Sequence, residues 1–145
     1  MNAKELAEYC ASPPEPEEGE EPLVTPDLGI LDPEGNGTLF YSYLPDSPDN
    51  CITIYDTGGW AKDPDITRTD PTFQFVFRGA GYDEAQVLIK KFKDWFIPNN
   101  IPKKLFYINS YYIHLVQPLQ AAPFYLGRDE NGRDKFTWNF TFIVH

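Results

Sequence analysis

The chain has 145 residues, which is enough for one domain with a hydrophobic core that needs no disulfide bonds. Its net charge is −10, and 16% of its residues are aromatic, a share that suits both a large core and a subunit interface. Tight binding to a nucleic-acid backbone needs clustered basic residues, and the lysines within 90–93 and at 103–104 fit better on the solvent side of a helix and in the loop after it. The composition therefore argues against sequence-specific nucleic-acid binding.

The cysteines and the apolar segments bear on where the protein is made. Cys10 and Cys51 have no metal-ligand spacing, and the sequence allows a disulfide bond between them without favouring one. The first ten residues lack the apolar stretch of a signal peptide, and no apolar run reaches the roughly 18 residues that a membrane helix needs. We therefore expect a soluble protein made in a reducing cytoplasm.

A short helix and an acidic arm precede the main domain. Apolar residues recur at helical spacing over 3–10, which predicts one helix within the segment 1–11. The segment 12–37 contains six of the fourteen prolines, and residues 1–37 carry a net charge of −9, against −1 for residues 38–145. Such a segment cannot bury enough apolar surface to offset its ordering entropy, so we predict an extended arm at 12–37, disordered alone or ordered against neighbours. The folded domain is predicted for 38–145.

Beyond the arm, apolar and polar side chains alternate with the period of two that is typical of β-strands. Around Phe75, three phenylalanines share one face of the predicted strand, whereas Thr72, Gln74 and Arg78 share the opposite, solvent face. The last strand alternates in the same way, with threonine and asparagine on its polar face. The predicted strands cover residues 38–43, 51–55, 72–78, 105–117 (as one strand or two) and 136–144.

One long helix is predicted among these strands. Ala85, Leu88 and Phe92 fall at helical spacing with two further aromatic residues, lysines fill the other face, and Pro98 follows the helical segment 82–96. The elements together predict an α+β domain of two layers. In this fold a mostly antiparallel sheet packs its apolar face against the main helix, its other face is polar and mostly uncharged, and the short helix precedes it.

One motif resembles a catalytic turn. Asp-Thr-Gly at 56–58 follows a hydrophobic strand as in aspartic proteases, and Tyr-Leu-Gly-Arg-Asp at 125–129 is similar to a second motif of the half-size, homodimeric proteases of retroviral type. Three features argue against a protease: Gly59 replaces the usual small Ala or Ser, a turn follows the second motif where a helix is usual, and the helix 82–96 has no place there. The simpler interpretation is a strand end at which Asp56 accepts hydrogen bonds from local amides and the glycines supply positive φ angles.

No other constellation of catalytic or metal-binding residues stands out. The two histidines have no serine or cysteine setting that suggests a triad. The pairs Asp46/Asp49 and Asp63/Asp65 lack the spacing of a calcium-binding loop, and turn chemistry explains them more simply. We therefore predict no catalytic residue, no metal ion and no cofactor.

Three stretches together resemble the minor capsid or tail terminator proteins of bacteriophages with long, non-contractile tails. The first is Leu-Pro-Asp-Ser-Pro-Asp-Asn at 44–50, which leads into Ile-Tyr-Asp-Thr-Gly-Gly at 54–59. The second is Asp-Pro-Thr-Phe-Gln-Phe at 70–75. The third is Pro-Phe-Tyr-Leu-Gly-Arg-Asp-Glu-Asn-Gly-Arg at 123–133. The first and third, in this order around a long helix, are the more specific, and the resemblance covers about residues 38–145 and the short helix.

The resemblance implies a small subunit without an active site that assembles in the host cytoplasm and resides in the neck of the virion. Six copies are expected to form a ring that caps the tail tube, stops its polymerisation and docks onto the head connector. The expected partners are thus other copies of the chain, the tail tube protein and the connector or stopper protein, and DNA passes through the lumen without sequence-specific binding. The alternatives are another neck or head-completion protein, a homodimeric protease that uses Asp56, and a soluble adaptor domain.

A head-to-tail ring needs two different complementary patches on each subunit. The long loops 56–70 and 121–134, of mixed polarity and bearing aromatic residues, are the candidates. The residues expected at subunit, tube or connector interfaces are Asp56, Trp60, Asp63, Asp65, Arg68, Phe124, Tyr125, Arg128, Asp129 and Arg133.

Overall fold

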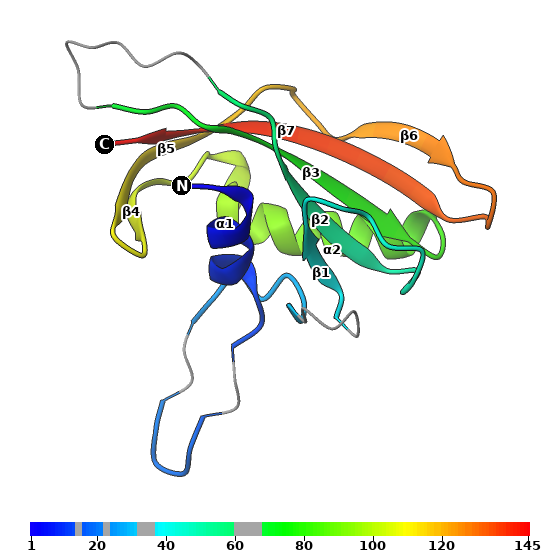
Figure 1. The fold of residues 1–145 in the computed structure, drawn as a ribbon, viewed down its shortest axis with the longest axis horizontal. Coiled ribbons are helices and arrows are strands. Elements are labelled where there is room, and N and C mark those ends of the chain that lie inside the picture. Colours follow the sequence, from blue (N-terminus) through cyan, green and yellow to red (C-terminus); the bar gives the residue numbers. More distant parts are fainter. Residues whose placement is uncertain (14–15, 22–23, 32–36, 60–67) are drawn as a thin grey trace.

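The computed structural model describes residues 1–13, 16–21, 24–31, 37–59 and 68–145 (Figure 1). The helices are α1 (Ala3–Cys10) and α2 (Tyr82–Phe96), and a 3-10 turn, η1 (Pro98–Asn100), follows α2. The strands are β1 (Leu39–Tyr41), β2 (Cys51–Asp56), β3 (Thr72–Gly79), β4 (Lys104–Ile108), β5 (Tyr111–Pro118), β6 (Phe124–Arg128) and β7 (Asp134–Val144).

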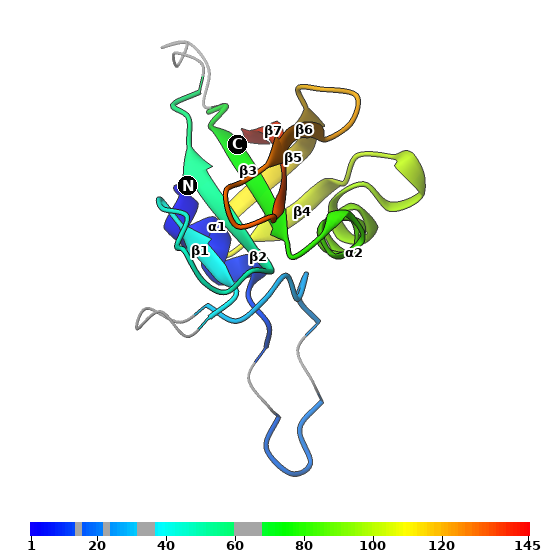
Figure 2. The ribbon, with the colours of Figure 1, turned by 90° about the vertical axis from the view of Figure 1, so that its right-hand side faces the viewer.

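The seven strands form a single mixed sheet in the order β1-β2-β3-β7-β5-β4, and β6 also pairs with β7. Only the β1–β2 pair among the described strands is parallel. The sheet curls, and both helices lie on the same face of it (Figures 1 and 2). The predicted α+β class, with one main helix on a mostly antiparallel sheet and a short N-terminal helix, is confirmed.

An aromatic core joins α2 to the sheet. The buried side of α2 carries Ala85, Ile89, Phe92 and Phe96, which follow the helical repeat. These side chains meet the apolar face of β3 and β7, where alternate phenylalanines and Trp138 point inward. The chain enters α2 through Gly79, where a Cβ would overlap the backbone nitrogen of Ala85. A glycine is therefore needed for this close approach between β3 and the helix.

The short helix α1 covers the part of this face that α2 leaves open. Asn2 caps it, accepting a hydrogen bond from the backbone N–H of Glu5 at 2.9 Å. Its four buried residues, of which Leu6 and Cys10 are the largest, point into the core. The Trp95 indole donates to the Tyr9 hydroxyl at 3.1 Å and so links α1 to α2.

The described end of the acidic segment is packed against α1. The backbone N–H of Leu28 donates to the carbonyl of Cys10 at 2.9 Å, and the N–H of Ser12 donates to the carbonyl of Gly29 at 2.8 Å. Leu28 is 2% exposed, and Leu31 forms a parallel bridge with Leu39 of β1. The folded unit therefore includes residues near 28–31, whereas an arm at 12–37 stays a prediction.

Three details differ from the sequence prediction. The segment 121–134 is not a loop throughout, because it contains β6; its apolar run Phe124-Tyr125-Leu126 has no alternation, and a bulge shifts the register against β7. The first strand ends at Tyr41, since Ser42 adopts a positive φ of 66°. Arg78 lies on the expected solvent face and yet is 2% exposed. Threonines of that face on β2 and β7 are buried as well, because the sheet is curled.

Candidate subunit interface

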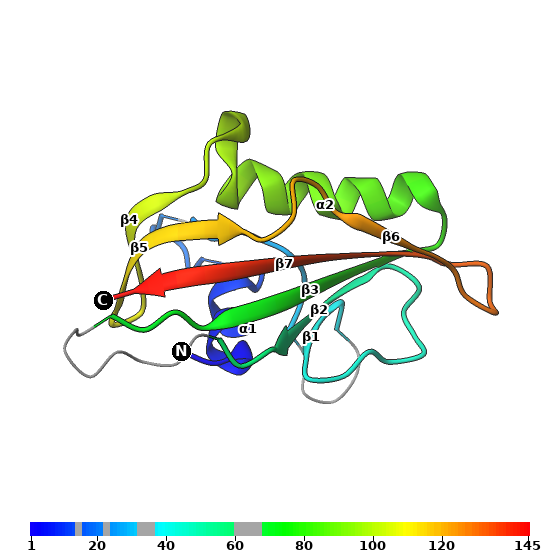
Figure 3. The same ribbon diagram turned by 90° about the horizontal axis from the view of Figure 1, so that it is seen from above.

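The described parts of the two predicted patches lie at opposite ends of the long strands (Figure 3). At one end, Asp56 pairs with Phe73 of β3, and Thr69, which follows Arg68, bridges to Val144 at the end of β7. The turn between β6 and β7 is at the other end, beside the last residue of β3. Trp60, Asp63 and Asp65 lie outside the described residues. Among the described candidates, Asp56 and Arg68 thus lie apart from the strand β6 and the turn that contains Asp129.

Asp56 connects the N-terminal helix to the end of β2. Its Oδ1 accepts the backbone N–H of Ala3 at 2.8 Å, a partner 53 residues away, and its expected bonding to local amides stays a prediction. The following glycines, Gly58 and Gly59, have φ angles of 94° and 110°, as expected for a turn. A Cβ on Gly59 would also overlap the carbonyl oxygen of Asp70. The arrangement at Asp56 is thus explained by a connection between α1 and the end of β2.

An ion pair closes the turn between β6 and β7. Asp129 Oδ1 accepts the backbone N–H groups of Asn131 and Arg133, both at 2.9 Å. Its Oδ2 accepts a hydrogen bond from the Nε–H group of Arg133 at 2.8 Å. The side chain of Arg133 is 6% exposed, although arginines in turns are usually solvated. The turn is therefore held by its own side chains, independently of any partner.

Two buried arginines, Arg133 of this turn and Arg78 of β3, hold the loop 44–50. Arg133 donates to the carbonyl oxygen of Asp46 and lies 3.6 Å from a carboxylate oxygen of Asp49. Arg78 donates to the carbonyl oxygens of Pro48 at 2.6 Å and Asp49 at 3.2 Å. The first and third stretches of the resemblance thus meet in space. No spacing rule in the sequence could have indicated this, because Arg133 and Asp46 are 87 residues apart.

The strand β6 presents apolar side chains to solvent. Phe124, Tyr125 and Leu126 are 63%, 44% and 48% exposed. The Tyr125 hydroxyl donates to the carboxylate of Asp134, and its ring contacts that of Tyr82 at the start of α2, with a centroid distance of 6.2 Å. Tyr125 is thereby fixed within its own subunit, whereas Phe124 and Leu126 are available to a neighbour. Arg128 is also exposed, with Nε 3.7 Å from Asp134.

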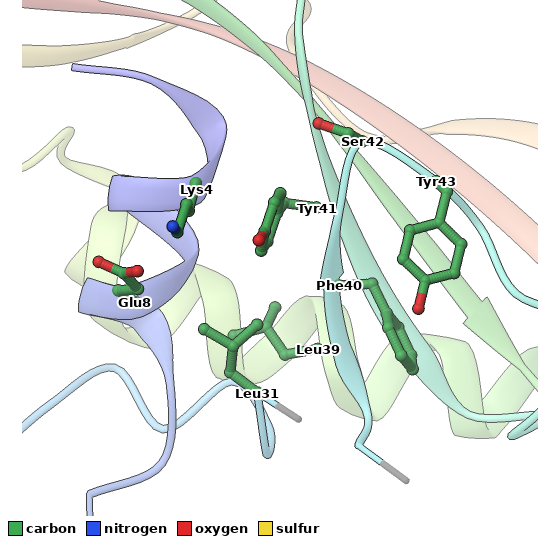
Figure 4. Close-up of a pocket in the computed structure, with 8 residues that line it drawn as sticks. All are labelled: Lys4, Glu8, Leu31, Leu39, Phe40, Tyr41, Ser42 and Tyr43. Atoms are coloured by element: carbon green, nitrogen blue, oxygen red, sulfur yellow. The ribbon is translucent and has the colours of Figure 1, made fainter. Parts of the chain in front are cut away.

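A groove beside β1 was not expected from the sequence. It has a volume of about 560 Å³ and straddles the edge of β1, with Lys4 and Glu8 of α1 on one side and Tyr43 on the other (Figure 4). The remaining lining residues are mostly apolar: Leu31, Leu39, Phe40, Tyr41 and Ser42. Because α1 and β1 are far apart in the chain, only the tertiary structure creates this groove.

Comparison with known proteins decides the family. The family model described as "Bacteriophage tail terminator protein" matches residues 26–145. The chain belongs to this family. A chain from the virion of a native gene transfer agent (GTA) particle has a similar fold, with a TM-score of 0.51 and 12% sequence identity over 72% of this chain and 77% of that chain. No curated protein sequence matches.

The family assignment confirms the resemblance seen in the three sequence stretches. The tail terminator family and the GTA neighbour are virion structural proteins, so a structural role in the phage tail is supported. Within the described residues, no group of histidine, cysteine or acidic side chains could hold a metal ion. In the same part of the chain, no helix is long and apolar enough to cross a membrane. Cys10 and Cys51 are free and buried.

In this member of the tail terminator family, the ion pair between Asp129 and Arg133 predicts that the stability of the fold depends on pH. Hydrogen bonds from the backbone N–H and side chain of Arg133 lower the pKa of Asp129 below its ordinary 3.8. The charged carboxylate therefore stabilises the fold fully above pH 3.8, and this contribution is lost as the pH falls through the lower folded pKa. We expect Asp129→Asn to remove this part of the pH dependence. Urea unfolding at neutral pH and below pH 3.8 measures it, with Asp94→Asn, in an exposed ion pair with Lys90, as the control.

Proposed function

We propose that this chain forms a hexameric ring that caps the tail tube, stops its polymerisation and gives the head connector a docking surface. Membership of the tail terminator family over residues 26–145 carries the proposal. The structure supports it with two unlike surfaces at opposite ends of the sheet, so that axial contacts and contacts between subunits can use separate parts of the chain. The turn at Asp129 and the exposed strand β6 are held rigidly, which lowers the ordering cost of association.

The patch around Asp56 is assigned to axial contacts with the tube or the connector. Arg68 is exposed there and pairs with Asp70 at 2.9 Å, so the surface carries both charges. Trp60, Asp63 and Asp65 belong to the same loop and stay predicted members of this patch. The patch at the other end, with Phe124 and Arg128 at the two ends of β6 and the Asp129–Arg133 pair holding the turn that follows, is assigned to contacts between subunits.

DNA is proposed to pass through the ring without being held. The chain has a net charge of −10, and the first 37 residues have a net charge of −9. A lumen without concentrated positive charge does not trap phosphates, because retention requires the release of counterions by several lysines or arginines. The acidic segment is the main candidate lumen surface, because several residues of the polar face of the sheet, such as Arg78 and Thr53, are buried.

Tube growth in the presence of the purified protein tests the function. Tail tube protein is allowed to polymerise with and without this chain, and tube lengths are measured in electron micrographs. We expect shorter tubes that end in a disc, and binding to connectors alone would instead favour a head-completion role. Tubes of unchanged length without an added disc would contradict capping.

The variant Asp56→Asn separates a ring protein from a protease in the same assay. The asparagine side chain keeps an oxygen that can accept the N–H of Ala3, so we expect folding and ring formation to be unchanged. An aspartic protease would lose all activity, because its paired carboxylates share a proton. Peptide cleavage by the wild-type protein that Asp56→Asn abolishes would overturn the structural role.

A further inference from the structure

The two lateral edges of the sheet differ in a way that suits a repeated contact. The strand β1 ends the sheet on one side, where Leu31 bridges to Leu39. On the other side of β7, β5 and β4 continue the sheet along one part of β7, and β6 pairs with the other part. Within the described residues, β6 pairs with β7 alone. Exposed edge strands with apolar side chains readily pair with another chain, and natural proteins usually shield them. These two edges face away from one another, so a contact between them joins unlike surfaces and repeats around a ring.

On the outer edge of β1, Leu39 is already paired within the chain, and Tyr41 is the position at which an added strand would pair. The N–H of Ile52 donates to the carbonyl of Thr38, and the N–H of Ser42 donates to the carbonyl of Ile54, so alternate residues of β1 face β2. The N–H of Leu39 faces outward and donates to the carbonyl of Ile30. The alternation directs the N–H and C=O of Tyr41 away from β2, beside the groove.

The apolar side chains of β6 match the apolar lining of this groove. Phe124 and Leu126 are exposed on β6 and suit that lining. On the α1 side the groove carries both charges, Lys4 and Glu8, and Glu8 is the one that can pair with the exposed Arg128 at the end of β6. Since the groove straddles the edge of β1, a strand added there places alternate side chains on both of its faces (Figure 4).

We propose that β6 of one copy adds to the edge of β1 in the next copy, with Phe124 and Leu126 against the α1–β1 groove and Arg128 toward Glu8. This contact rests on the proposed ring and names the surfaces that close it. A second copy fits better than a foreign peptide, because the chain itself carries both halves on opposite edges. The contact joins unlike surfaces, so each subunit donates one strand and receives one.

Chemical cross-linking between two introduced cysteines tests the contact. Ser42→Cys places a thiol at the groove, and Leu126→Cys places one on β6. A short bismaleimide is added to the assembled full-length protein, and products are separated on a denaturing gel. The native Cys10 and Cys51 are buried, and burial raises the pKa of both thiols, so they react slowly. The doubly substituted chain is expected to give a ladder that ends at the covalent hexamer.

Mixtures of the single variants establish that the two surfaces are different. An equal mixture of Ser42→Cys and Leu126→Cys chains is expected to give covalent dimers and nothing larger. The control pair is Ser110→Cys with Leu126→Cys, since Ser110 is exposed in the turn between β4 and β5, and it is expected to give no product.

The outcomes distinguish this contact from the ring itself. Rings in electron micrographs without the Ser42–Leu126 ladder would overturn the contact and leave the ring standing. Dimers from Leu126→Cys alone would also overturn it, because they indicate a symmetric contact. Absence of rings for the wild-type protein, alone and on tubes, would instead overturn the proposed function.

Discussion

Replacement of Phe92 by alanine is expected to lower the free energy of unfolding by about 3–5 kcal/mol. Phe92 is fully buried, and its ring is the centre of the aromatic core between α2 and the sheet. Centroid distances of 4.6 to 5.9 Å separate it from the rings of Phe75, Phe77, Phe96, Trp138 and Phe140. The truncation removes contacts with all of them and leaves a cavity that rigid β-strands cannot fill.

Urea unfolding followed by tryptophan fluorescence measures this loss. Val87→Ala is the matched control, because Val87 lies on the same helix and is 58% exposed. Its substitution is expected to change stability by less than about 0.5 kcal/mol. A cost below about 1 kcal/mol for Phe92→Ala would mean that α2 does not pack on the sheet as described.

Replacement of Arg133 by methionine is expected to cost about 2–3 kcal/mol and to weaken ring formation. Methionine keeps the length and apolar stem of the side chain but removes the guanidinium group that joins the β6–β7 turn to the loop 44–50. Asp129 then loses a charge-assisted hydrogen bond while it is only 14% exposed. Because the turn positions β6, its loosening raises the concentration at which rings assemble.

Two further variants show whether the geometry of Arg133 matters. Arg133→Lys retains the charge and loses the planar fork, so we expect it to recover only part of the stability. Lys90→Met breaks an ion pair whose partners are 76% and 65% exposed, and should cost about 0.3–0.5 kcal/mol. Equal costs for Lys90→Met and Arg133→Met would show that the buried pair contributes no more than a surface pair. Urea unfolding and sedimentation of each variant provide both readouts.

The regular elements could be predicted because their side chains repeat. The alternation from Phe136 to Val144 indicated β7, and the helical spacing from Ala85 to Phe96 indicated α2 with its observed bounds. In both, the apolar face is buried along the whole length, so the apolar repeat indicates the element, whereas the burial of Thr137 and Thr141 on the polar face of β7 had no such signal. The same reasoning failed for β6, where a bulge between Tyr125 and Gly127 interrupts the alternation.

The candidate interface was predictable only in part. Loop length and composition pointed to the turn that contains Asp129 and to Phe124, which the structure places at one end of the sheet. The burial of Arg133 and Arg78 depends on carbonyl groups of the loop 44–50, which tertiary folding alone brings near. The α1–β1 groove likewise has no local signature, because it forms between distant segments.

The mass of the assembled wild-type protein tests the account most directly. Native mass spectrometry across a range of protein concentrations distinguishes closed rings from monomers and from open polymers. A head-to-tail contact that closes predicts one discrete assembly of six subunits whose size stays constant as the concentration rises. A monomer at every concentration, or a continuous series of ever longer polymers, would contradict the closed ring.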